Sequence, residues 1–76
     1  MKDNLTNEIV QIALDTVGVE LTESENLKDS GLDSLALVSV VIAIEEKYGI
    51  TFSFEDILPI NLVKLSDLVR ITESYL

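Results

Sequence analysis

The sequence predicts an all-α protein, a small four-helix bundle with three longer helices, one short third helix and a long first loop. Apolar residues recur at helical spacing in a segment near each end, and an almost continuously apolar segment without a helix breaker lies between them. The candidate strand at residues 50–52 has no second strand to pair with. Because no repeat or low-complexity segment is present, we expect residues 1–76 to form a single domain.

The first helix is expected from Asp3 to Val17. Gly18 supplies its C-terminal cap, since glycine adopts the left-handed conformation at low cost. Asp3 and Asn4 are both candidate N-caps, and the sequence leaves that choice open. The apolar stripe consists of Leu5, Ile9, Ile12 and Ala13, widened by Val10, Leu14 and Val17.

Residues 19–33 are expected to form a long ordered loop, because they are rich in polar residues and show no sustained period. Leu21, Leu27 and Leu32 are predicted to pin this loop across the helices. Loops of this length are uncommon in compact domains and are often functional. From Glu20 to Asp33 five acids face only Lys28, which fits a partner with a basic patch and fits equally well a loop that is merely solvated.

A second helix is expected from Leu35 to Tyr48, with Ser34 as N-cap and Gly49 at its end. Nine of the ten residues from Leu35 to Ile44 are apolar, so one face exceeds what so small a core can cover. An exposed apolar strip rimmed by acids is a candidate binding surface. A central helix packed on two sides explains the same composition, and both interpretations stay open.

A short helical turn is expected at residues 54–58, because Ser53 and Asp56 resemble a capping box and Pro59 stops the turn. The last helix is expected to begin at Ser66 or just before it. Its apolar face is made by Leu65, Leu68, Val69, Thr72 and Leu76.

Composition excludes several classes of function. Fourteen acidic and five basic residues give a net charge of −9, which argues against nucleic acid as a partner. The longest apolar run, residues 35–44, is far shorter than the roughly 20 residues of a membrane span. The absence of cysteine and of an apolar leader predicts a cytoplasmic protein, which we expect to be a monomer.

Enzyme chemistry and metal binding are not expected. Without His or Cys, the chain cannot build a catalytic triad or a thiol nucleophile, and a bundle this small leaves little room for a substrate pocket. We therefore expect no catalytic residues. The acids around Asp29 and Asp33 lack EF-hand spacing, so no metal site is expected. Ser34 has no base beside it, but a phosphate ester there would be stabilised by the helix dipole.

The segment Gly31-Leu32-Asp33-Ser34-Leu35 resembles the acyl carrier protein family, and the resemblance covers the whole chain. The motifs that follow it match the family in order and spacing. They are the apolar run Val38 to Ile44, then Glu45-Glu46-Lys47-Tyr48-Gly49, and Phe54-Glu55-Asp56-Ile57 at the short third helix.

The resemblance implies that Ser34, flanked by Asp33 and Leu35, is esterified with 4'-phosphopantetheine from coenzyme A. A separate phosphopantetheinyl transferase that uses Mg2+ performs this step. Acyl groups then ride on the terminal thiol as thioesters, and the carrier presents them to partner enzymes of fatty-acid, polyketide or related lipid metabolism. Those partners are a loading ligase or acyltransferase and a ketosynthase or condensation-type enzyme. The carrier itself catalyses nothing and raises the effective concentration of its cargo.

Two departures from the family pattern point to a specialised member. Ala36 and Ser39 stand where carriers of fatty-acid synthesis usually have acids, while Glu45 and Glu46 remain. Lys64 replaces a common helix-capping Thr, a role that we expect Ser66 to take. The predicted partner-binding residues are Leu37, Val38, Val41, Ile42, Glu45 and Glu46.

Two other functions remain open at the level of sequence. One is an aminoacyl or peptidyl carrier of a nonribosomal-peptide type of pathway. The other belongs to a different class: an unmodified helical adaptor whose apolar second helix binds a partner and whose Ser34 is only an N-cap.

Overall fold

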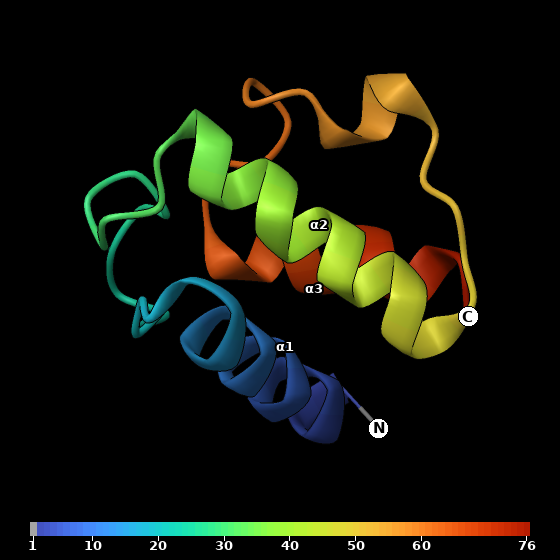
Figure 1. Cartoon of the computed structure of the whole chain (residues 1–76), viewed down its shortest axis with the longest axis horizontal. Coiled ribbons are helices and arrows are strands. Elements are labelled where there is room, and N and C mark those ends of the chain that lie inside the picture. The colour runs from blue at the N-terminus through green and yellow to red at the C-terminus, as the bar shows by residue number, and fades with distance from the viewer. Residues whose placement is uncertain (1) are drawn as a thin grey trace.

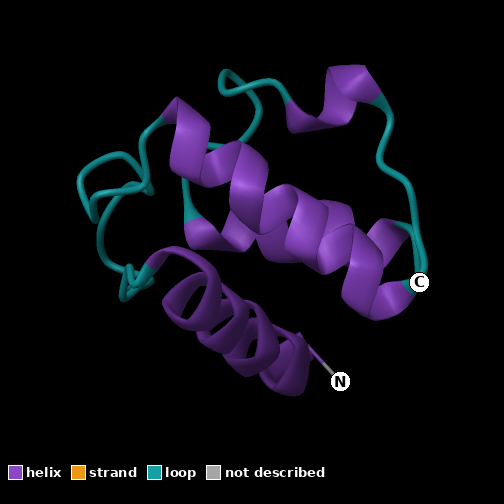
Figure 2. Cartoon of the chain, viewed as in Figure 1, coloured by secondary structure: helices purple, strands orange, loops and turns teal. Residues whose placement is uncertain are grey.

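Helices account for the regular structure throughout the described part of the chain. The computed structural model describes the backbone of residues 2–76 and the side chains of residues 4–76. In chain order the elements are α1 (Lys2–Val17), α2 (Ser34–Tyr48), the 3-10 turn η1 (Phe54–Ile57) and α3 (Leu65–Ser74). Figure 2 shows helices joined by loops, without a strand in the described residues. The all-α prediction is confirmed, and its short third helix is a single 3-10 turn.

Helix α1 packs against both α2 and α3, and α3 lies behind α2 in the view of Figure 1. The segment that carries η1 runs along the side of α2 opposite to α1 (Figure 1). The buried side chains form one core drawn from every helix and from the first loop. They are Leu5, Ile9, Ile12, Ala13, Leu21, Leu27, Leu32, Leu37, Val40, Val41, Ile44, Phe52, Leu62, Leu65, Leu68 and Val69.

The loop at residues 19–33 is fixed by its leucines, as predicted. Leu21, Leu27 and Leu32 are all buried, and each such side chain contributes roughly 1.5–3 kcal/mol when removed from water. A backbone hydrogen bond of 2.8 Å from the Leu27 N–H to the Val63 carbonyl ties the loop to the segment before α3. The loop therefore holds a defined path up to the start of α2.

Two predicted boundaries differ in the structure. Helix α1 is already formed at Lys2, so neither Asp3 nor Asn4 is its N-cap. Helix α3 ends at Ser74, which leaves Leu76 exposed beyond the apolar face that it was predicted to share. The helical period predicts burial only for residues inside the helix, and Leu76 lies beyond its end.

The capping devices of η1 and α3 also differ from the predictions. The Ser53 side chain makes no capping hydrogen bond, and the Asp56 carboxylate accepts from the phenol of Tyr75 rather than from the Ser53 N–H. At α3, Ser66 lies inside the helix. Lys64 is the N-cap, and the Asp67 carboxylate reaches back to accept from the N–H groups of Val63 and Lys64, just before the helix, at 3.1 and 3.0 Å.

Candidate functional site

Ser34 is the first residue of α2 and is exposed. The prediction that Ser34 is the N-cap is wrong: the cap is Asp33, whose backbone is extended and whose carboxylate accepts from the Ala36 N–H at 2.8 Å. The Ser34 hydroxyl makes no hydrogen bond within the described residues. It is therefore free to react without any loss of helix capping.

The backbone around Ser34 is set by a tight turn just before the helix. Gly31 has a φ of 105°, a conformation that side chains with a Cβ rarely adopt. The Leu32 N–H returns to the Leu27 carbonyl at 3.0 Å, and the Leu32 side chain is buried. This turn aims the chain into α2 so that the next two residues, Asp33 and Ser34, stay on the surface.

The amides of Ser34 and Leu35 have no acceptor within the described residues, because an α-helix leaves its first N–H groups without internal partners. Together with the positive end of the helix dipole they favour an anion next to the Ser34 hydroxyl. A phosphate ester at this position fits the chemistry of the site.

Ser34 lines two grooves. The first, here called the loop groove, lies between residues 26–34 and 59–63 and has a volume of about 400 Å³. The second, here called the η1 groove, lies between α2 and residues 54–59 and has a volume of about 240 Å³. A group attached to the Ser34 oxygen would stand where these two grooves meet.

The structure divides the predicted partner-binding residues into two sets. Val38 and Ile42 are about half exposed, whereas Leu37 and Val41 are only 6% and 3% exposed and form the floor of the η1 groove. The core therefore buries two of the four apolar positions, so α2 combines the two interpretations that the sequence left open, an exposed apolar strip and a helix packed in the core.

The two predicted acids have different surroundings. The carboxylate of Glu45 accepts from the Phe52 N–H at 2.8 Å, so it holds the chain that leaves α2. Glu46 is exposed and has no described partner. Of these two acids, Glu46 is the one whose carboxylate is available for contact with another protein.

The sequence prediction of site residues left out two exposed apolar side chains, Phe54 and Ile60. Phe54 is 76% exposed and lines the η1 groove, and Ile60 is 80% exposed on the segment after η1. Leu35, which the sequence does place beside Ser34, is 78% exposed. The sequence does hold a sign of this for Phe54. It lies in a short polar turn, where an aromatic side chain cannot be part of the apolar face of a helix.

Tyr75 anchors the wall of the η1 groove. Its phenol donates to Asp56, and its oxygen accepts from the Ser53 N–H at 2.8 Å. The Phe52 and Tyr75 rings meet edge to face with centroids 5.0 Å apart. The hydrogen bond to Asp56 is the main reason that the pKa of Tyr75 is raised above its ordinary value.

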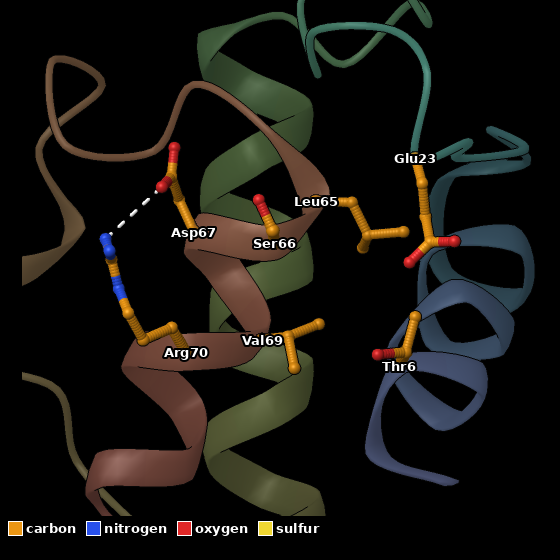
Figure 3. Close-up of a pocket in the computed structure, with 7 residues that line it drawn as sticks. All are labelled: Thr6, Glu23, Leu65, Ser66, Asp67, Val69 and Arg70. Atoms are coloured by element: carbon orange, nitrogen blue, oxygen red, sulfur yellow. Dashed lines mark hydrogen bonds and ion pairs between the residues drawn. The ribbon is translucent and has the colours of Figure 1, made fainter. Parts of the chain in front are cut away.

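A third hollow, of about 330 Å³, lies between α1, the first loop and α3. Figure 3 shows Leu65 and Val69 pointing from α3 toward Thr6 and Glu23 across it. Its one basic side chain, Arg70, is already paired with Asp67 at 3.2 Å. None of the residues that line this hollow lines either groove at Ser34, so the two grooves are the candidate functional site.

Comparison with known proteins identifies the family. The family described as "Phosphopantetheine attachment site" matches residues 7–71. An acyl carrier protein from Coprothermobacter proteolyticus is 38% identical over 79 residues, which cover 99% of this chain and 94% of that protein. The chain belongs to the acyl carrier protein family.

Other acyl carrier proteins agree with this assignment. One from Helicobacter acinonychis is 40% identical over 63 residues, covering 83% of this chain and 77% of that protein. The crystal structure of an acyl carrier protein from Thermotoga maritima matches with a TM-score of 0.84 at 25% identity, covering 97% of this chain and 88% of that one. The resemblance predicted from the residues is confirmed.

Membership of the acyl carrier protein family establishes what kind of protein this is. Acyl carrier proteins are carriers rather than enzymes, as predicted, and their attachment domain carries covalent phosphopantetheine. Within the described residues, no group of three or more acids forms a metal-binding cluster, and none of the helices has the length and apolar character of a membrane span.

Proposed function

We propose that Ser34 is the attachment site for 4'-phosphopantetheine and that residues 1–76 work as one acyl carrier domain. One observation supports this most directly: the Ser34 hydroxyl is exposed and unbonded at the first position of α2, while Asp33 performs the capping. The same geometry disfavours the adaptor hypothesis, in which Ser34 served only as an N-cap.

The modification is a phosphoryl transfer carried out by a separate transferase with Mg2+. A bond forms between the Ser34 oxygen and the phosphorus that bears the pantetheine of coenzyme A. The bond to the second phosphate breaks, and adenosine 3',5'-bisphosphate leaves. The serine proton passes through the transferase to the leaving group or to water. The attached arm ends in a thiol that holds acyl groups as thioesters, and in a chain without cysteine it is the only thiol.

The partner enzymes are proposed to dock on the apolar surface beside Ser34. Val38, Ile42 and Phe54 supply exposed apolar contact around the η1 groove, and the exposed Glu46 supplies charge four residues after Ile42 on α2. Such a surface fits a partner with an apolar centre and a basic rim. Because Ala36 and Ser39 stand where acids would extend that rim, we propose enzymes of a polyketide or other specialised pathway, in the cytoplasm, rather than the general fatty-acid enzymes.

The test is incubation with coenzyme A, Mg2+ and a broad-specificity phosphopantetheinyl transferase, followed by intact-mass measurement. We expect the mass to rise by one phosphopantetheine in the native chain. The matched control is Ser30→Ala, a serine of the loop just before α2, which should still be modified, whereas Ser34→Ala should not. A circular-dichroism melt verifies that Ser34→Ala is folded. Absence of any mass gain in the native chain, or a gain that persists in Ser34→Ala, would remove the proposal.

A further inference from the structure

The two grooves beside Ser34 differ in what they can hold. Ligand pockets in proteins usually span roughly 300–1,000 Å³. The loop groove, at about 400 Å³, lies within that range, and the η1 groove, at about 240 Å³, lies below it. The residues around the η1 groove are almost all apolar, whereas the loop groove also presents the polar side chains of Asn26, Lys28 and Asp33.

Lys28 is the one basic side chain among the residues that line the loop groove. It is exposed and forms no ion pair with any carboxylate whose position the structure describes. Asp33, the acid on the same groove, has one carboxylate oxygen occupied by the Ala36 N–H. A cation without a partner thus lies on the groove that begins at Ser34.

The positive charge of Lys28 matters because modification of Ser34 adds negative charge to the same groove. A phosphodiester on Ser34 adds a negative charge next to Asp33, in a chain that already carries −9. Like charges so close repel each other, and a neighbouring ammonium group offsets that repulsion. Arg70, the basic side chain of the third hollow, is already committed to Asp67, so it offers no such compensation.

The remaining lining suits the rest of the arm. Pantetheine contains two amides and a dimethyl carbon, so it needs both polar and apolar contacts. The loop groove offers the Asn26 side-chain amide, which has no hydrogen bond to a described residue. Its apolar walls are Leu27, Leu32, Leu37, Pro59, Leu62 and Val63.

We propose that the phosphopantetheine arm rests in the loop groove, with Lys28 as the counter-ion of its phosphodiester and Asn26 as a partner for its amides. This inference rests on the proposed modification of Ser34. It assigns the arm to the side of Ser34 formed by the first loop and the segment before α3, and it leaves the η1 groove open for apolar contact with a partner or cargo.

The experiment uses the modified chain, verified first by intact mass, with a nitroxide spin label on the thiol of the arm. Because the chain has no cysteine, the label attaches only there. Paramagnetic broadening of backbone amides then reports where the arm spends its time. We expect stronger broadening at Leu27 and Leu62 of the loop groove than at Ile42 and Ile57 of the η1 groove.

The matched variants are Lys28→Gln and Lys47→Gln, the latter removing a lysine at the far end of α2. Lys28→Gln should abolish the contrast between the two grooves, and Lys47→Gln should retain it. Salt at about 1 M, where the Debye length is about 3 Å, should also reduce the contrast. Both variants are exposed and are expected to fold, which their amide spectra verify.

The outcomes separate this inference from the proposed function. A mass gain combined with equal broadening at both grooves, stronger broadening at the η1 groove, or a contrast that survives Lys28→Gln overturns the inference and leaves the modification of Ser34 in place. If no mass gain occurs, the proposed function fails and this inference fails with it.

Discussion

Tyr75 donates a hydrogen bond of 2.5 Å from its phenol to the carboxylate of Asp56, joining the residue after α3 to the turn η1. The same oxygen accepts the Ser53 N–H. Since η1 forms one wall of the η1 groove, the shape of that groove depends on a contact made outside it. No side chain of η1 is fully buried, and the Asn61 side chain also holds the turn by donating to the Glu55 carbonyl at 2.8 Å.

Tyr75→Phe tests this anchor. The variant keeps the ring that packs against Phe52 but loses the donor to Asp56 and the acceptor for Ser53. We expect faster amide exchange across residues 53–57 and little change in α1. Asp56→Asn is the comparison variant, since it retains an oxygen that can accept from Tyr75. Unchanged exchange at residues 53–57 in Tyr75→Phe would show that the turn is held by other contacts.

The capping arrangement at α2 predicts opposite behaviour for two neighbouring residues. Asp33→Ala should lower the free energy of unfolding by about 1 kcal/mol, the usual cost of losing an N-cap. Ser34→Ala should change it by less than about 0.5 kcal/mol, because the hydroxyl has no partner. Denaturant unfolding measures both values.

Asp33→Asn is the control for charge, since asparagine caps as well as aspartate. It should be nearly as stable as the native chain. A larger stability loss from Ser34→Ala than from Asp33→Ala would contradict the observed cap.

Sequence predicted the core well because burial imposes a period. Leu5, Ile9, Ile12 and Ala13 of α1 are buried as expected, whereas Leu14, also predicted in that stripe, is 44% exposed. The loop leucines Leu21, Leu27 and Leu32 are buried as well, although they follow no period. The cap of α2 was misassigned because Asp33 and Ser34 are neighbours with nearly equal capping preference. What decides between them is the backbone turn at Gly31 and Leu32, which no propensity encodes.

The exposed face of α2 could not be predicted for a different reason. A helix that is apolar on nearly every side carries no polar positions to mark its outer face. The way the other elements pack around α2 determines that Leu37 and Val41 are buried while Val38 and Ile42 are half exposed. The hydrogen bond of Glu45 to the backbone seven residues further on left no trace in the sequence either.

Substitutions at Glu45 and Glu46 are therefore expected to differ in effect: those at Glu45 should lower stability, and those at Glu46 should change partner binding. Glu45→Ala leaves the part-buried Phe52 N–H without its acceptor and should cost about 1–2 kcal/mol of stability. Glu46→Ala is expected to stay within about 0.5 kcal/mol of the native chain and to act only on partner binding. Glu45→Gln, which keeps an acceptor oxygen, is the control. Equal stability of Glu45→Ala and Glu46→Ala would argue that the Phe52 contact contributes nothing.

The raised pKa of Tyr48 predicts that the folded protein loses stability at alkaline pH. Burial raises the pKa of Tyr48 to about 12, assisted by its hydrogen bond to Glu8 and by the negative charge of Glu8. Because this value lies above the ordinary 10, the contribution of Tyr48 is complete below pH 10 and is lost as the pH rises toward 12. The stability difference between the native chain and Tyr48→Phe should thus shrink across that window. A difference that stays constant would show that the phenol does not ionise there.

The apolar character of α2 is expected to decide which enzymes accept the carrier. The double variant Ala36→Glu with Ser39→Glu restores two acids beside Val38 and Ile42, so the charged rim extends over the apolar surface. We expect improved acceptance by a ketosynthase of general fatty-acid synthesis, measured as acyl transfer with the modified carrier. The control Ala36→Gln with Ser39→Gln adds similar bulk without charge and should give no improvement. Charge complementarity speeds the encounter of carrier and ketosynthase only where their docking surfaces meet. Equal rates for the native, acidic and glutamine forms would therefore mean that this face of α2 does not set partner choice.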